Sequence, residues 1–147
     1  MQIQAPAAPA EVTPDTAAEI QTRIASSADI LIARQRARAR AVALGFNSAD
    51  VTTIVAAVSE IARNIIDHAQ SGEILLRILA TAERCGLQII ARDHGPGIPD
   101  VERAMRYGES GQHRLGVGLP GVKWLMDEFD IASSVGRGTT VTLIKWA

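Results

Sequence analysis

A polar face on one predicted helix holds the first residues that could do chemistry. Glu60, Asn64 and Asp67 recur at positions i, i+4 and i+7, so they lie on one side of a helix, with His68 at the border of that side. Apolar residues recur at helical spacing on a different side and define a buried stripe. Taken alone, the polar face fits either a solvated surface or one wall of a site.

The second group is a stretch from residue 93 to residue 121 that holds seven of the twelve glycines in the chain. An apolar run at residues 87–91 predicts a buried strand, which delivers Asp93 to a turn containing Gly95 and Gly97. Glycine at this density indicates backbone in conformations that other residues resist, or backbone that a ligand approaches closely.

The second glycine cluster, residues 116–121, reads G-x-G-x-x-G, which is a fingerprint of dinucleotide-binding folds. That fingerprint requires a hydrophobic strand directly before it and an acidic residue about 20 positions after it. Polar residues 109–114 precede the cluster and no acidic residue follows Asp130, so we reject a dinucleotide site. A P-loop is also rejected, because Val122 stands where that motif requires lysine. What remains is a set of glycine N–H groups at a helix N-terminus, where phosphate binds readily.

Composition excludes several other classes of protein. The formal net charge is −1 and aromatic residues make up 3% of the chain, which disfavours a nucleic-acid-binding surface. The single cysteine, Cys85, leaves no internal disulfide and no cysteine-based zinc cluster. No apolar run approaches the ~20 residues of a membrane span, and residues 1–15 lack the features of a signal peptide. We therefore expect a cytoplasmic protein without nucleic-acid or membrane partners.

Periodicity and turn signals predict the elements that must position these residues. We expect strands at 19–25, 73–82, 87–92, 130–135 and 139–146, helices at 28–44, 47–69, 99–107 and 117–129, and a hairpin loop at 83–86. Residues 1–16, rich in alanine and proline, are expected to form a flexible tail, and residues 17–147 a single domain. This order predicts an α+β fold, a two-layer sandwich of mixed β-sheet and helices.

Four features in this order resemble the Bergerat (GHKL) ATP-binding fold that histidine kinases share. They are the polar helix face, the turn after Asp93, the second glycine cluster and the segment 138–140. A narrower resemblance is to the RsbT family of stressosome switch serine/threonine-protein kinases. It extends over residues 18–147 and rests on the stretches 33–35, 44–46, 59–64, 93–100, 118–123, 125–129 and 145–146. It implies an ATP- and Mg²⁺-dependent protein kinase.

Roles for residues in the glycine-rich stretch follow from that resemblance. Asp93 would accept a hydrogen bond from the adenine amino group, with Gly95, Gly97, Ile98 and Thr139 completing its pocket. The phosphates would lie on the second glycine cluster, and the residues implicated there are Gly116, Val117, Gly118, Leu119 and Gly121. Residues 108–115 would form a lid, in which Arg114 could contact the γ-phosphate.

The polar helix face supplies the remaining roles that the resemblance implies. Asn64 would be a ligand of Mg²⁺, a cation that prefers oxygen ligands and bridges phosphate oxygens. Glu60, one helical turn earlier, would be the catalytic base that takes the proton of an acceptor serine or threonine. Asp67 and His68 would lie near the nucleotide.

The resemblance also implies partners. Substrates would be STAS-domain antagonist or scaffold proteins, and the released kinase would bind and activate a PP2C-type phosphatase or another output protein. The alternative is a non-catalytic or weakly catalytic, ATP-gated binding module of the anti-sigma-factor type, but the presence of Glu60 favours the kinase. The lid departs from the family, because members often have one rich in serine and glycine and residues 108–115 are bulkier and charged.

Overall fold

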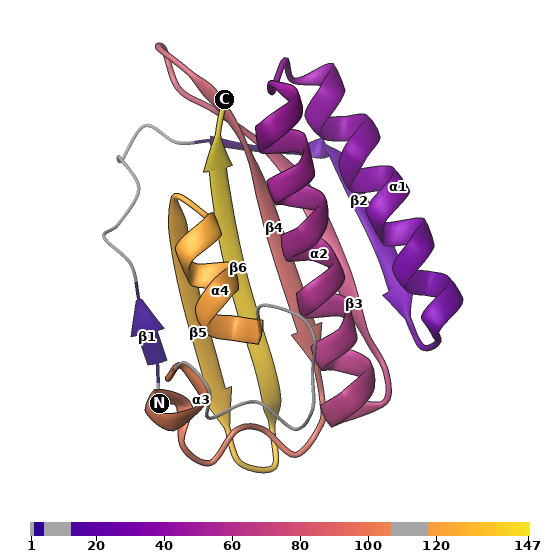
Figure 1. Cartoon of the computed structure of the whole chain (residues 1–147), viewed down its shortest axis with the longest axis vertical. Helices are drawn as coiled ribbons and strands as arrows, with labels where there is room; N and C mark the ends of the chain where they lie inside the picture. The colour runs from indigo at the N-terminus through magenta and orange to yellow at the C-terminus, as the bar shows by residue number, and fades with distance from the viewer. Residues whose placement is uncertain (1, 5–12, 107–117) are drawn as a thin grey trace.

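The chain folds into a six-stranded sheet that carries α1, α2 and α4 on one face (Figure 1). The computed structural model describes residues 2–4, 13–106 and 118–147. The strands are β1 (Gln2–Gln4), β2 (Thr13–Ile24), β3 (Gly72–Ala80), β4 (Cys85–Asp93), β5 (Glu128–Ser134) and β6 (Gly138–Trp146). The helices are α1 (Ser27–Ala43), α2 (Ser48–Ala69), α3 (Val101–Ala104) and α4 (Gly118–Leu125). The predicted α+β class and its two layers are confirmed.

The prediction of a mixed sheet is wrong. The strand order is β1-β5-β6-β4-β3-β2, and each neighbouring pair is antiparallel. Two helices, α1 and α2, connect β2 to β3 and return the chain to the end of the sheet that it left, so these strands must run in opposite directions. β4 and β5 run in the same direction, but β6 lies between them and prevents a parallel pair.

The segment predicted as a flexible tail contains strand residues where the structure describes it. β1 pairs with β5, with Ile3 opposite Ile131, and β2 already begins at Thr13. Backbone pairing with an existing sheet edge supplies hydrogen bonds that do not depend on side chains, so a segment with few branched apolar residues can form a strand. Residues 1 and 5–12 lie outside the described residues.

Capping residues start the two long helices near the predicted positions. The Oδ2 atom of Asp29 accepts a hydrogen bond from the Ser26 N–H at 3.1 Å at the start of α1. The Oδ1 atom of Asn47 accepts one from the Asp50 N–H at 2.8 Å at the start of α2. In the part of the chain that the structure describes, no helix is long and apolar enough to cross a membrane.

The core lies between the helices and one face of the sheet. α2 contributes the predicted apolar stripe, whose buried members include Val51, Ile54, Val55, Val58, Ile61, Ala62 and Ile65. The other face of the sheet is mixed: Leu79, Ile144 and Trp146 form a second buried apolar cluster there. It also carries two ion pairs, Arg92 with Glu73 at 2.9 Å and Arg77 with Glu19. Burial of the stripe fixes the rotation of α2 about its axis, and therefore the direction in which its polar residues point.

The β3–β4 hairpin turns two residues earlier than predicted, at 81–84 in place of 83–86. The Thr81 hydroxyl accepts hydrogen bonds from two N–H groups of the loop, at 3.2 and 3.0 Å, and this closes the turn early. Gly86 therefore lies in β4 and has a packing role, because a Cβ there would stand 2.7 Å from Cε3 of Trp146.

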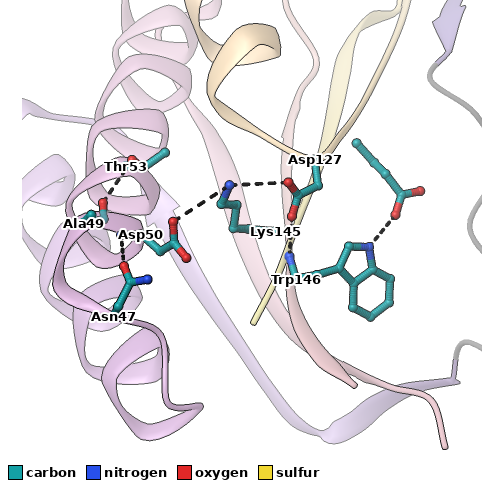
Figure 2. Close-up of polar contacts among 8 residues, drawn as sticks. Asn47, Ala49, Asp50, Thr53, Asp127, Lys145 and Trp146 are labelled. Atoms are coloured by element: carbon teal, nitrogen blue, oxygen red, sulfur yellow. Dashed lines mark hydrogen bonds and ion pairs between the residues drawn. The ribbon is translucent and has the colours of Figure 1, made fainter. Parts of the chain in front are cut away.

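α4 is shorter than predicted, and Phe129 lies in β5. The Asp127 carboxylate ends the helical segment by accepting a hydrogen bond from the Trp146 N–H at 2.7 Å (Figure 2). Lys145 Nζ lies 3.4 Å from Oδ1 of Asp127 and 4.0 Å from Oδ1 of Asp50. These charges join the start of α2, the end of β6 and the connection from α4 to β5.

The turn after α2 contains a position whose backbone conformation suits glycine better than the residue that occupies it. Gln70 has a φ of 68°, a region in which L side chains are strained. Replacing Gln70 by glycine is expected to raise the free energy of unfolding by about 1 kcal/mol. Urea denaturation measures the change, with Gln70→Ala as a control that keeps the Cβ and should not stabilise. A Gln70→Gly protein no more stable than wild type would contradict this account.

Candidate nucleotide-binding site

Asp93 lies at the end of β4, between β3 and β6, with its carboxylate held by two backbone N–H groups. Its Oδ1 accepts hydrogen bonds from the Gly95 N–H at 2.9 Å and from the Thr139 N–H at 3.2 Å. Within the described residues, Oδ2 accepts no hydrogen bond. Because the protein holds Oδ1, Oδ2 has a fixed direction and can accept a hydrogen bond from a ligand.

Ser133, a buried residue of β5 that the sequence did not single out, joins the two segments on either side of this carboxylate. Its Oγ accepts the Ile98 N–H at 2.7 Å, donates to the Gly138 carbonyl oxygen at 3.2 Å and lies 2.8 Å from Oγ1 of Thr139. One hydroxyl thus links the turn after β4 to the start of β6. The alternation of inward and outward residues along β5 places Ser133 at an inward position. A polar residue at a position that faces inward is the sequence feature that could have indicated it.

The glycines around the end of β4 are needed because the chain itself approaches them closely. A Cβ on Gly95 would stand 2.5 Å from Cβ of Ala69, at the end of α2. Gly97 has a φ of 79°, and a Cβ there would stand 2.2 Å from the carbonyl oxygen of Ser134. A Cβ on Gly138 would stand 2.1 Å from a carbonyl oxygen at the end of β4. These glycines are explained by close packing within the protein and, at Gly97 and Gly138, by a positive φ, which is the first of the two alternatives that the sequence left open.

The polar face of α2 is buried at one end and exposed at the other. Glu60 is 9% exposed, Asn64 is half-buried, and Asp67 and His68 are exposed. α4 packs against α2 in the same layer. A uniformly solvated face, which the sequence alone allowed, is therefore excluded. Carboxylates are rarely buried to this extent without a specific partner or a function.

The start of α4 forms the described part of the second glycine cluster. Gly118, Leu119 and Gly121 are buried, and Gly118 has a φ of 65°, in the left-handed region that favours glycine. The first N–H groups of a helix have no partner within it, so this end can meet an anion. Outside the described residues lie the other residues predicted for this end: Arg114, Gly116, Val117 and the lid at 108–115.

The end of β4, the second half of α2 and the start of α4 lie toward one end of the molecule (Figure 1). A cavity of about 230 Å³ opens there, lined by Asp93, Thr139 and residues of both strands of the β5–β6 hairpin. Glu60 and Asn64 do not line it. Arg92, Ala132 and Thr140, which also line it, pair across neighbouring strands on the sheet face that does not carry the helices, so the cavity is not assigned to a site shared with α2 and α4.

Comparison with known proteins decides the family. Residues 24–145 match the histidine kinase-like ATPase domain. Over 124 residues the chain is 48% identical to the serine/threonine-protein kinase RsbT of Bacillus subtilis, a match that covers 84% of this chain and 93% of that protein. The chain belongs to the RsbT-type serine/threonine-protein kinases.

Other relatives of this RsbT-type chain are anti-sigma factors. It is 33% identical over 103 residues to the anti-sigma F factor of Caldanaerobacter subterraneus, which covers 66% of this chain and 71% of that protein. It is 36% identical over 103 residues to the anti-sigma F factor of Anoxybacillus flavithermus, which covers 65% of this chain and 69% of that protein.

The fold of RsbT-type kinases is also found in a solved structure. The crystal structure of the RsbU and RsbW domains of a Mycobacterium tuberculosis protein matches with a TM-score of 0.57 and 21% identity, covering 86% of this chain and 32% of that chain. This likeness bears on the fold alone, and it confirms the GHKL-type fold. With the family established, the chain is an ATP-using protein serine/threonine kinase among the partner-switching regulators.

Proposed function

We propose that the chain transfers the γ-phosphoryl group of ATP, with Mg²⁺, to serines or threonines of STAS-domain antagonist or scaffold proteins. Once released from them, it would bind and activate a PP2C-type phosphatase or another output protein. The observation that carries this proposal is the combination, in an RsbT-type chain, of the fixed Asp93 carboxylate with the buried Glu60. The first suits adenine recognition and the second suits proton transfer.

Adenine would be recognised at Asp93. The N6 amino group of adenine is a hydrogen-bond donor, and Oδ2 of Asp93 is an acceptor whose direction is set by the two bonds to Oδ1. Thr139 and Ile98 flank this position and are held by the Ser133 hydroxyl. The base end of the site is thus assembled before the ligand binds, which lowers the entropic cost of binding.

The phosphates would extend from this end toward the first turn of α4. Without side chains, Gly118 and Gly121 let phosphate oxygens approach the N–H groups of that turn, and the helix dipole favours negative charge there. In this proposal Arg114, Gly116 and Val117 complete the contact with the γ-phosphate. Asp67 and His68, exposed near the end of α2, would border the nucleotide without enclosing it.

Mg²⁺ would be held by the side-chain oxygen of Asn64 together with phosphate oxygens and water. A magnesium ion that accompanies a nucleotide commonly has only one or two protein ligands. The described residues contain no group of three or more His, Cys, Asp or Glu side chains that could hold a metal. The donor set therefore fits an ion carried by the nucleotide, which would neutralise charge on the phosphates during transfer.

Glu60 would act as the general base. The acceptor hydroxyl oxygen forms a bond to the γ-phosphorus, the bond from that phosphorus to the oxygen of the departing ADP breaks, and the hydroxyl proton passes to Glu60. Its burial shields the carboxylate from water, so a protein acceptor can compete with hydrolysis.

A second candidate is an ATP-gated binding module with little phosphotransfer, and identities of 33% and 36% to anti-sigma F factors favour it. A module that only binds partners needs no carboxylate at the position of Glu60, which supports the kinase.

Phosphotransfer assays test the proposed function. We would mix the chain with γ-labelled ATP, Mg²⁺ and purified STAS-domain proteins of the source organism. Label is expected on a serine or threonine of a STAS-domain protein, and none when the Mg²⁺ is chelated. Nucleotide binding without transfer to any of these proteins would instead support the binding module.

Replacing Asn64 by alanine is expected to abolish the part of thermal stabilisation by ATP that depends on Mg²⁺. A ligand that binds only the folded state stabilises it, by about 2.7 kcal/mol at 100 times Kd. Scanning fluorimetry with ATP, in Mg²⁺ or in EDTA, measures the difference in Tm. Gln35→Ala, which removes an exposed amide from α1, is the control and should respond as wild type does. An undiminished Mg²⁺ effect would remove Asn64 as a ligand.

A further inference from the structure

The side of α1 that faces away from the core exposes large apolar side chains. Leu31, Ile32 and Val42 are 56%, 40% and 61% exposed. They are three of the five large apolar residues that are exposed in the described part of the chain. The other two, Trp124 and Val135, lie apart from each other on α4 and in the β5–β6 hairpin. Apolar exposure is therefore concentrated on α1.

Helical periodicity separates this side from the buried one. The buried side of α1 consists of Ile30, Ala33, Ala37 and Ala41, and it faces α2. At about 100° per residue, the opposite side contains a continuous set of exposed residues, which we term the α1 outer face. Its members are Ala28, Leu31, Ile32, Gln35, Ala39 and Val42. The α1 outer face runs about 20 Å along the helix.

Three arginines border the α1 outer face, Arg34 and Arg38 on one side and Arg36 on the other, and no acidic residue lies within it. Arg34 and Arg38 are exposed, lie one helical turn apart, and form no hydrogen bond or ion pair with another described residue. Arg36, on the other border, donates to a hydroxyl of β2 at 2.9 Å. The one acidic residue of α1, Asp29, belongs to its N-terminal cap. The surface thus combines an apolar centre with positive charge that has no partner within the described residues.

We propose that the α1 outer face docks a partner protein whose contact surface has an apolar centre and an acidic rim. Leu31 and Val42 would enter the apolar centre, where desolvated side chains contribute most of the binding energy. Arg34 and Arg38 would pair with carboxylates at the rim, where opposite charges speed association and select the partner.

The partner is the output protein of the proposed function. The inference rests on the proposed function for this identity of the partner. α2 lies between α1 and α4 in the helical layer (Figure 1), so a protein bound to the α1 outer face leaves the start of α4 uncovered. A phosphate acceptor must bring its hydroxyl to the phosphates beside α4. An output protein has no such requirement and can bind at a distance from the nucleotide.

A second copy of the chain or a membrane fits this surface less well. In a symmetric contact between two α1 helices, Arg34 and Arg38 of one copy would face arginines of the other, and opposed like charges are unfavourable. Helices that lie on membranes insert bulky side chains such as Trp, Phe and Leu. The α1 outer face has no Trp or Phe, and beside Leu31, Ile32 and Val42 it contains the small Ala28 and Ala39 and the polar Gln35.

Surface variants of the full chain test the proposal. The double variant Leu31→Ser/Val42→Ser removes the apolar centre, and Arg34→Glu/Arg38→Glu reverses the charge of the rim. Trp124→Ser is the matched control, because Trp124 is 83% exposed on a different helix. Calorimetric titration measures binding to a PP2C-type phosphatase of the source organism. We expect binding at least about tenfold weaker for both α1 variants and unchanged for the control, with labelling of the STAS-domain protein retained.

Circular dichroism verifies that each variant folds. If one of the two α1 variants does not fold, the other still tests the proposal. Unchanged phosphatase binding by both overturns the proposal. An equal loss of STAS labelling does so too, because the α1 outer face would then serve the acceptor. A wild-type dimer that becomes monomeric in the variants assigns the surface to a second copy, and lost sedimentation with phosphatidylserine vesicles assigns it to a membrane.

The two proposals fail in different ways. Wild-type chain that labels a STAS-domain protein but binds no phosphatase overturns the docking surface alone. Phosphatase binding that depends on the α1 outer face, without labelling of any STAS-domain protein, counts against the proposed kinase substrates and supports the docking surface.

Discussion

A Glu60→Gln variant should bind ATP with nearly the affinity of wild type and transfer phosphate about 10²- to 10⁴-fold more slowly. Glutamine has almost the shape of glutamate, so the packing around this buried position is retained. Its amide cannot take up the proton of the acceptor hydroxyl. Single-turnover labelling at saturating nucleotide and acceptor measures the step, and lost rate with retained binding indicates a group that acts in the transition state.

Glu83→Gln is the matched control for this variant. It removes an exposed carboxylate from the β3–β4 loop, at the far end of β4 from Asp93, and should label at the wild-type rate. If Glu60→Gln labels as fast as Glu83→Gln, Glu60 is not the base, and catalysis rests on the positioning of the phosphates and acceptor.

Asp93→Asn should weaken ATP binding by roughly 10- to 100-fold. In the wild type, Oδ1 accepts the N–H groups of Gly95 and Thr139. An asparagine that keeps both bonds must put its oxygen there, so its NH₂ group turns toward the amino group of adenine. Two donors then face each other, and leaving them unsatisfied costs about 1–3 kcal/mol. Titration with ATP measures the loss.

A nucleotide without the amino group distinguishes loss of adenine recognition from distortion of the turn after β4. Purine riboside triphosphate lacks that donor, so Asp93→Asn should bind it as well as the wild type does. Asp100→Asn changes a nearby carboxylate that caps α3 and is the control for lost charge. Equal losses for ATP and for the purine analogue would mean that Asp93 holds the turn and does not read the base.

Sequence patterns were sufficient where one element determines its own structure. Asn47 caps α2 because the N–H group that it bonds is three residues away. The apolar stripe of α2 repeats with the helical period, and its burial follows directly. Asp93 was found in the same way, since an apolar strand precedes it and a glycine-containing turn follows.

The remaining features depend on contacts between residues far apart in the chain. Ser133 joins Ile98 to Thr139, and no local pattern indicates which loops will meet. Asp127 ends the segment of α4 through a bond to Trp146, which depends on the register of β5 with β6. The burial of Glu60 likewise depends on how the rest of the fold packs around α2, so the sequence alone left its face open to two interpretations.

The outermost strands also determine how the sheet meets other molecules. β1 has only three residues, so it offers little backbone to a further strand. At the opposite edge, β2 contains Pro14, which has no N–H group to donate, and its pairing with β3 shifts register between Asp15 and Ile20. Short, irregular edges oppose the edge-to-edge joining of sheets that leads to aggregation. The protein can therefore keep an open antiparallel sheet in solution while its other face carries the helices and the nucleotide end.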